Sequence, residues 1–340
     1  MSNGKHIPKV AVITRTKDRG LLLERAIKSV HQQTMEDFVH VIINDAGDPA
    51  IVEDLVKKHE QLIRGRVKII HNTESRGMEA ASNKAIKSVD STFIAIHDDD
   101  DTWHPDFLKA TTERLEDNGM QGVVVTTDRV VEDIIDDVVH IKLVERWLPW
   151  AKAINFYSMC IDNYATPITF LYRRAVYDKI GYYDENLPVL GDWDFALRFI
   201  RLHDIDFINS DTALAYYHHR PNVKGINGNS VFAGIDKHEY YLNQVANKFL
   251  REDLQRGSLG FGYMFSHLRA QRDNRRDMER QLEKIECQTQ QLNQQVEEVR
   301  RTLGERTTGA HIKSLYRIAK KVPRLTLHKV KNTIKKAGRI

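Results

Sequence analysis

The sequence predicts an α/β fold built on a mostly parallel sheet. Four short apolar runs, each typical of a buried strand, occupy residues 10–13, 39–43, 67–70 and 93–96. Segments with the helical spacing of apolar residues lie between them, at 21–31, 51–62 and 78–89. Strands that alternate with helices of this length are joined by crossover connections and lie parallel in one sheet. Because the runs are apolar at nearly every position, we expect both faces of the sheet to be covered.

Residues 121–220 follow a looser pattern that we expect to extend the sheet. Strands are predicted at 122–126, 138–144, 168–172 and 212–217, with a short helix ending at Gly181 and another near 193–203. We expect this extension of the sheet to form an acceptor pocket.

Residues 268–303 have the spacing of a coiled coil. The seam positions alternate four and three residues apart, and the residues between them are mostly Gln, Glu and Arg: Met278, Leu282, Ile285, Thr289, Leu292, Val296, Val299 and Leu303. A narrow seam of about four heptads predicts a coiled coil. One amphipathic helix folded back on the body is the alternative. Residues 256–260 are expected to form a hinge before it.

A basic segment, residues 311–340, ends the chain. It holds ten Lys or Arg and no Asp or Glu, so the rest of the chain has 41 basic and 47 acidic residues, a net charge of −6. Apolar residues recur with helical spacing on both sides of Pro323. A basic amphipathic helix of this kind predicts binding to an anionic membrane surface. Nucleic acid is the alternative partner of this basic segment. Tyr316 is its only aromatic residue that could stack on a base, so we expect no binding to nucleic acid.

The composition favours a cytoplasmic protein. No stretch reaches the roughly 20 apolar residues that span a bilayer, and no apolar signal region precedes the first strand. Cys160 and Cys287 lie in unrelated contexts, which does not indicate a disulfide. With the basic tail, this predicts peripheral association with the inner face of the cell membrane.

Four consecutive aspartates, Asp98 to Asp101, follow the fourth predicted strand. Four like charges in a row become favourable when a divalent cation with oxygen ligands shares the site. An open α/β sheet binds its ligand at this carboxyl end of the strands. The plainer alternative is an acidic loop in which Asp101 caps a helix that begins near Pro105.

The other predicted parallel strands also end in polar residues. The first strand ends in Thr14-Arg15-Thr16-Lys17-Asp18-Arg19 and the second in Asn44-Asp45-Ala46-Gly47-Asp48, and the third crossover begins Asn72-Thr73-Glu74-Ser75-Arg76-Gly77. These ends can surround one cleft. Together with the aspartate run and Thr102-Trp103-His104-Pro105, they resemble the nucleotide-binding half of inverting family 2 glycosyltransferases of the GT-A fold, of bacterial surface-polysaccharide type. The resemblance covers roughly residues 8–220.

The resemblance implies a donor site with a metal ion. Asp98-Asp99-Asp100 matches the D-x-D motif of the family, so Asp100 is expected to coordinate Mn²⁺ or Mg²⁺. By the same resemblance, Asp98 and Asp99 hold the donor or assist the metal. The remaining donor-binding residues that it implies are Thr14, Arg15, Thr16, Asp45 and Arg76. Asn44 stands where the family often has a first Asp, and Arg-Thr-Lys-Asp replaces the commoner Thr-Tyr-Asn on the first strand.

The resemblance also implies a catalytic base near residue 192. The family has an acidic pair at the start of a helix; Asp192 matches its Asp, and Gly191 stands where a Glu is often found. A carboxylate there removes the proton of the attacking hydroxyl, whereas the plainer alternative is a helix cap. Asp194 and Trp193 are expected to support the site or contact the acceptor. His218 is expected to be a further metal ligand; His219 cannot face the same point from a strand.

These observations predict a glycosyltransferase of hexosyltransferase type. It would move a sugar from a nucleotide sugar of the UDP class to a hydroxyl of a lipid-linked or growing surface glycan. The alternatives are a nucleotidyltransferase or other nucleotide-sugar enzyme, and a non-catalytic coiled-coil scaffold at the membrane. The expected parts are the GT-A domain at 1–245, a linker at 246–265, a coiled coil at 266–306 that forms homo-oligomers, and a membrane-associating tail at 307–340.

Overall fold

The structure, a computed structural model, describes residues 6–229 and 235–305, and the described residues divide into two units between Leu268 and Arg269. The strands are β1 (Val10–Thr16), β2 (Phe38–Asp45), β3 (Val67–Asn72), β4 (Phe93–Ile96), β5 (Thr102–Trp103), β6 (Gly122–Val125), β7 (Thr127–Ile135), β8 (Val138–Arg146), β9 (Phe170–Arg173), β10 (Ile205–Ile208) and β11 (Ala215–His219). The helices are α1 (Gly20–His31), α2 (Pro49–Lys58), α3 (Glu60–Ile63), α4 (Met78–Lys87), α5 (Phe107–Asn118), α6 (Phe156–Ile161), α7 (Tyr177–Ile180), α8 (Gly191–Ile200), α10 (Ile235–Arg256) and α11 (Phe261–Glu305). Short 3-10 helices lie at Pro167–Thr169, Arg174–Val176 and Gly225–Asn227.

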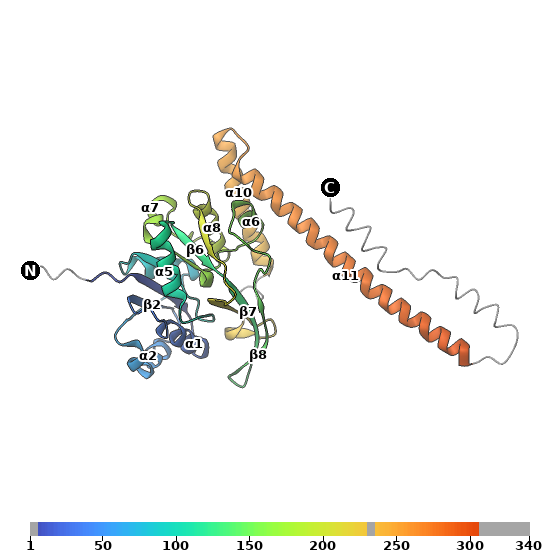
Figure 1. The fold of residues 1–340 in the computed structure, drawn as a ribbon, viewed down its shortest axis with the longest axis horizontal. Coiled ribbons are helices and arrows are strands. Elements are labelled where there is room, and N and C mark those ends of the chain that lie inside the picture. Colours follow the sequence, from blue (N-terminus) through green and yellow to red (C-terminus); the bar gives the residue numbers. More distant parts are fainter. Residues whose placement is uncertain (1–5, 230–234, 306–340) are drawn as a thin grey trace, which may run out of the picture. The chain divides into compact units, whose positions relative to one another are not determined.

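A seven-stranded mixed sheet forms the centre of the first unit (Figure 1). Its order is β10-β6-β9-β4-β1-β2-β3, and every neighbouring pair is parallel except the two that involve β9. The four N-terminal strands that the sequence predicts are confirmed as β1 to β4. The parallel run β4-β1-β2-β3 brings the carboxyl ends of these strands to one edge of the sheet, where the candidate site lies.

A second sheet, ordered β5-β11-β7-β8, lies beyond the aspartate run. Strand β7 was not predicted, although it pairs with β11 and forms a hairpin with β8. The two residues between β7 and β8, Asp136 and Asp137, both have positive φ, which suits the twist of a two-residue hairpin. The predicted segment 51–62 is two helices, α2 and α3, and β10 is a further strand that the pattern did not indicate.

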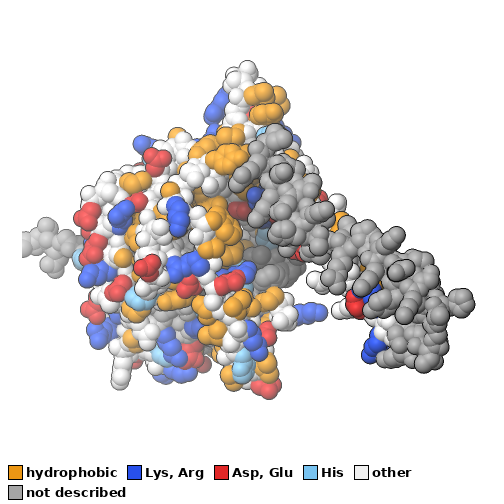
Figure 2. Space-filling model, turned by 45° about the vertical axis from the view of Figure 1, so that its right-hand side comes forward, with side chains coloured by type: hydrophobic (Ala, Val, Ile, Leu, Met, Phe, Trp, Pro, Cys, Tyr) orange, Lys and Arg blue, Asp and Glu red, His pale blue; other side chains and the backbone are white. Residues whose placement is uncertain are grey.

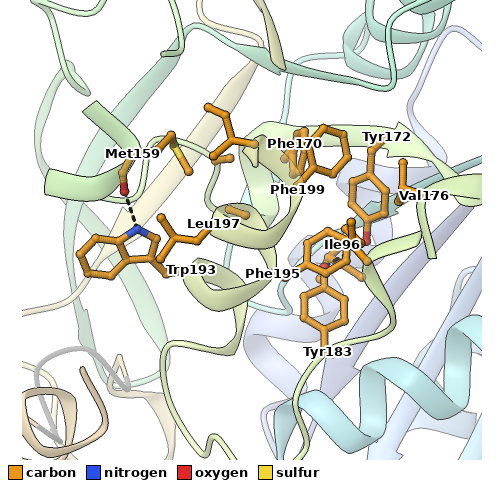
Figure 3. Packing of buried hydrophobic residues seen from close by; sticks show 14 of the residues in the cluster. Ile96, Met159, Phe170, Tyr172, Val176, Tyr183, Trp193, Phe195, Leu197 and Phe199 are labelled. Carbon is orange, nitrogen blue, oxygen red and sulfur yellow. Dashed lines mark hydrogen bonds between the residues drawn. The ribbon is translucent and has the colours of Figure 1, made fainter. Parts of the chain in front are cut away.

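The sheet is covered on both faces, as the apolar strands predict. On β1, Ala11 and Ile13 pack in a cluster with residues of α4, α8 and α10, whereas Val10 and Val12 pack with residues of α1 and α5. Figure 3 shows part of the first cluster, in which side chains of α8 lie against those of β9. This alternation places side chains of odd-numbered β1 residues on the same side of the sheet as α4 and α8.

Residues 246–265 are not a linker, and this corrects the predicted division of the chain. Helix α10 runs to Arg256, and Phe249 and Phe265 are fully buried in the core cluster of the first unit. The predicted hinge is a tight turn in which Gly257 has a φ of 70°. The carboxylate of Asp253 accepts hydrogen bonds from the backbone N–H groups of Gly260 and Tyr263, both at 2.9 Å, and thereby caps α11.

The second unit is described as far as Glu305 and consists there of the continuing helix α11. Helix α11 therefore spans most of the segment predicted to be a coiled coil, and the coiled coil itself stays a prediction. Four seam side chains, spaced seven residues apart, are each more than half exposed: Met278, Ile285, Leu292 and Val299. The basic segment lies outside the described residues.

Acidic and basic side chains are interspersed on the face of the molecule in Figure 2.

Among the described helices, none has both the length and the hydropathy needed to cross a membrane.

Candidate active site

The aspartate run lies at the end of β4 and is surrounded by arginines. Asp98 is paired with Arg15, and Asp99 accepts a hydrogen bond from Arg19 Nη1 at 2.7 Å. Asp100 Oδ2 accepts hydrogen bonds from Arg19 at 3.2 Å and from Arg220. Burial opposes the ionisation of Asp100, but the charges of Arg19 and Arg220 outweigh it and hold the pKa of Asp100 below its usual range.

Not every oxygen of this run has a protein partner. Asp99 is buried, and its Oδ2 makes no hydrogen bond to any residue in the described ranges. Burial raises the pKa of Asp99 to about 6, against the opposing charge of Arg19. Asp101 is also buried, and its Oδ1 accepts a hydrogen bond from the backbone N–H of His218 at 2.7 Å. Asp101 therefore ties the run to β11.

Glu132 on β7 organises the far side of the run. This fully buried carboxylate accepts hydrogen bonds from Arg25 Nη1 at 2.8 Å, Arg220 Nη1 at 2.9 Å and His218 Nδ1 at 2.7 Å. Burial alone would raise the pKa of Glu132, but the hydrogen bonds from His218 and Arg25 lower it far below its usual range. Arg220 thus joins two buried carboxylates, Glu132 and Asp100.

His218, the predicted further metal ligand, lies between Glu132 and Thr102. Its Nδ1 bonds to Glu132, and its Nε2 lies 2.9 Å from Thr102 Oγ1. Both ring nitrogens therefore have protein partners, so a metal at Nε2 would have to displace the Thr102 hydroxyl, and the role of His218 as a metal ligand stays a prediction. Across residues 6–229 and 235–305, no three His, Cys, Asp or Glu side chains are arranged as a preformed metal site.

The predicted residues of β1 divide between the two faces of the sheet. Thr14 is fully buried beside α1 and its hydroxyl lies 2.9 Å from His40 Nε2, so it does not reach the aspartate run. Arg15 points to the opposite face, where it donates to Asp98 and to Ser82 Oγ at 3.2 Å. Thr16 lies beside Asp99. The period of two in a strand separates Thr14 from Arg15.

Asp45 orders the loop between β3 and α4. Its carboxylate accepts hydrogen bonds from Asn72 and Ser75 at 2.8 Å and from the backbone N–H groups of Arg76 and Gly77 at 3.0–3.1 Å. Burial opposes ionisation of Asp45, but these hydrogen bonds lower its pKa. The Arg76 side chain is exposed and lines a groove beside α4.

Asp192 lies in the first turn of α8, on the same side of the sheet as Arg15. Its Oδ2 accepts a hydrogen bond from Asn163 Nδ2 at 2.9 Å. Burial raises the pKa of Asp192, and the charge of Asp98 adds to this effect while Arg15 opposes it. The candidate base and the aspartate run therefore share one electrostatic environment.

The neighbours of Asp192 hold the helix in place. Trp193 packs in the core, and its Nε1 donates to the carbonyl of Met159 at 2.8 Å (Figure 3). Asp194 is fully buried and accepts hydrogen bonds from Arg198 at 2.8 Å and Lys248 at 3.1 Å. Both side chains hold α8 against the rest of the first unit.

Comparison with known proteins places this geometry in a family. A family model described as glycosyl transferase family 2 matches residues 11–181, half of the chain, including β1 to β4 and the aspartate run. The chain belongs to glycosyl transferase family 2. This membership favours a glycosyltransferase over the nucleotidyltransferase and the non-catalytic scaffold that the sequence left open.

Curated glycosyltransferases share part of the sequence. The chain is 23% identical over 197 residues to a putative colanic acid biosynthesis glycosyl transferase, WcaA, of Escherichia coli; the match covers 58% of this chain and 67% of that protein. Among four curated relatives that include WcaA, the matched share of the relative's length ranges from 33% to 67%.

Two solved structures show the same fold at low identity. TarS residues 1–349 of S. aureus, in complex with UDP-GlcNAc, has a TM-score of 0.58 at 17% identity, over 78% of this chain and 72% of that one. The mannosyltransferase PcManGT of Pyrobaculum calidifontis, with GDP-Man and Mn²⁺, has a TM-score of 0.51 at 16% identity, over 73% and 65%. These similarities confirm the GT-A type of fold for the first unit.

Several charged residues of the site were not assigned from the sequence, among them the half-buried Arg19 and the buried Glu79, Glu132 and Arg220. Glu132 carried a usable signal, because it interrupts the apolar run Val130-Val131 and Ile134-Ile135. A charged residue that is buried within a strand needs a partner of opposite charge.

Proposed function

We propose that this family 2 enzyme transfers a sugar from a nucleotide sugar to a hydroxyl group, with inversion at the anomeric carbon. One observation carries the proposal. Arg15 is paired with Asp98 at the end of β4 and lies 3.8 Å from Glu79, whose carboxyl group lies over Gly191, next to Asp192. A donor-binding carboxylate and a candidate base that are far apart in the sequence thus serve one site.

Asp192 acts as the general base in this proposal. A half-buried carboxylate with a raised pKa can take the proton of an acceptor hydroxyl while that oxygen attacks the anomeric carbon. The hydrogen bond from Asn163 orients the carboxylate. One base and an in-line displacement produce inversion without a covalent intermediate.

Asp100, assisted by Asp98 or Asp99, would hold a divalent cation, Mn²⁺ or Mg²⁺. The residues fit such an ion, because carboxylate oxygens are the ligands that hard cations prefer and Asp99 Oδ2 is buried without a hydrogen bond to the described residues. A bound cation would neutralise charge on the departing nucleoside diphosphate. Arg220 and Arg19 keep Asp100 ionised, which is the form that binds a cation.

The donor nucleotide lies over the carboxyl ends of β1, β2 and β4 in this proposal. Arg15, Thr16, Asp98 and Asp99 line this edge, and the exposed Arg76 faces the base or a phosphate. Asp45 contributes by holding the loop that carries Arg76. The nucleotide is of the UDP class.

The acceptor is a growing surface glycan or its lipid-linked precursor. Support comes from WcaA, whose name assigns it to colanic acid biosynthesis, and from the basic composition of residues 311–340. A chain that binds an anionic membrane surface through this tail would meet a lipid-linked acceptor at the inner face of the cell membrane.

Helix α11 joins copies of the chain as a coiled coil. Support comes from the exposed side chains of Met278, Ile285, Leu292 and Val299 at seven-residue intervals. Replacing Ile285 and Leu292 by Glu should lower the number of chains per particle in sedimentation, because two seam positions then carry like charges. Glu substitution of the exposed, polar Gln288 and Gln295 is the control; no change in the seam variant would contradict the coiled coil.

A donor screen tests the proposed function. The full chain is incubated with Mn²⁺ and a panel of nucleotide sugars that includes UDP-GlcNAc and GDP-mannose, and nucleotide release is measured. We expect release from one donor class, lost on addition of EDTA. Asp100→Asn should lower release by about 100-fold or more, because the ion and the diphosphate charge lose their carboxylate. Release that is unaffected by both EDTA and Asp100→Asn would contradict the metal assignment.

A further inference from the structure

Glu79 on α4 occupies the space in which a side chain at position 191 would lie. A Cβ atom on Gly191 would be 2.4 Å from Glu79 Cδ and 2.5 Å from Glu79 Oε1, closer than non-bonded atoms approach. The carboxyl group of Glu79 therefore lies directly over the first residue of α8, next to Asp192. Only a glycine at 191 leaves room for it.

Glu79 is buried and incompletely paired. It is 4% exposed, its Oε2 lies 3.8 Å from Arg15 Nη1, and this oxygen makes no hydrogen bond within the described part of the chain. Burial raises the pKa of Glu79 to about 8; the charges of Asp192 and Asp98 add to this effect, and that of Arg15 opposes it. A buried carboxyl group without full pairing costs folding free energy, so packing alone does not explain it.

Arg15 connects Glu79 to the aspartate run. The guanidinium of Arg15 lies between Glu79 and Asp98. It also donates a hydrogen bond to the hydroxyl of Ser82, which lies on α4 like Glu79. Glu79 thus contacts Arg15 on one side. On its other side it covers the first turn of α8, which contains Asp192. Glu79 therefore lies between the residues proposed to bind the donor, Arg15 and Asp98, and the proposed base, Asp192.

We propose that Glu79 is a positioning residue of the transfer reaction, which holds Arg15 with Asp98 and the start of α8 with Asp192 at a fixed separation. This inference rests on the proposed function. The carboxyl group takes the place beside Asp192 that a side chain at 191 would fill, but it is supplied by α4. A small displacement of a reacting group can cost about 100-fold in rate, so the effect should appear in kcat.

A double-mutant cycle between Glu79 and Gly191 tests the inference in the full-length chain. Glu79→Ala removes the carboxyl group, and Gly191→Ala displaces it through its added Cβ. Each should lower kcat for nucleotide release by about 10- to 100-fold, with KM for the nucleotide sugar and the melting temperature near those of the wild type. The double variant should be no slower than either single variant, because both changes remove the same contact. Glu79→Gln, which keeps the shape, should retain more activity than Glu79→Ala.

The control is Glu113→Ala, at an exposed position of α5, which should leave kcat unchanged. Wild-type kcat in Glu79→Ala, or losses that multiply in the double variant, would overturn the inference. If the wild type releases nucleotide and Asp192→Asn does not, either of these two outcomes counts against the role of Glu79 and leaves the proposed function standing. If the wild type releases no nucleotide from any donor, the proposed function fails and the inference falls with it.

Discussion

Replacing Asp192 by asparagine is expected to lower the rate of sugar transfer by about 10²- to 10⁴-fold, the usual contribution of a general base. Asparagine keeps the size of the side chain and can still contact Asn163 but cannot take a proton. The raised pKa of Asp192 brings it closer to the working pH, which makes it a better base than an ordinary aspartate. Nucleotide release with the preferred donor, measured beside the melting temperature, gives the result.

Asp178→Asn is the matched control, because Asp178 lies on α7 and is exposed. It should have wild-type activity and stability. Near-normal turnover by Asp192→Asn would show that another group accepts the proton. A large loss of stability would show instead that Asp192 acts mainly at the start of α8, which is the plainer interpretation of the sequence.

Replacing Arg220 by methionine is expected to reduce the free energy of unfolding by about 3–5 kcal/mol, as when one partner of a buried ion pair is removed. Arg220 is fully buried between Glu132 and Asp100, and its Nε donates to the carbonyl of Asn227 at 2.8 Å. Without it, both carboxylates lose a buried cationic partner. Urea unfolding at neutral pH measures the change.

The matched control is Arg114→Met. Arg114 is half exposed and pairs with Asp206 at the surface, so its loss should cost about 1 kcal/mol or less. Equal effects of the two substitutions would contradict the view that Arg220 holds the site together. Adding Glu132→Gln to Arg220→Met should recover part of the lost stability, because one uncompensated buried charge is then removed.

The sequence was sufficient for the regular half of the fold. Strands β1 to β4 are continuous apolar runs, and the helices between them have clear periodicity, so their order and parallel pairing could be predicted. Strand β7 was missed because Glu132 and other charged residues break its pattern. The burial of Phe249 and Phe265, which makes α10 and the start of α11 part of the first unit, depends on tertiary packing that local sequence does not reveal.

The sequence predicted the residues of the candidate site that lie at the ends of strands. It did not predict most of the residues that form hydrogen bonds and ion pairs with them. The family resemblance implies that the aspartate run and Asp192 serve one site, and the structure connects them through Arg15 and Glu79. The face of β1 on which Thr14 lies, and the pairing of both His218 nitrogens, could not be predicted because they depend on residues distant in sequence. Glu79 was missed for the same reason, since only the fold brings α4 against Gly191.

The stereochemistry of the released sugar tests the central claim most directly. With water as the acceptor, NMR spectroscopy of the anomeric proton can follow the first sugar product before it mutarotates. A single base at Asp192 and an in-line displacement predict the anomer opposite to that of the nucleotide sugar. A first product with the same anomeric configuration as the donor would contradict the account.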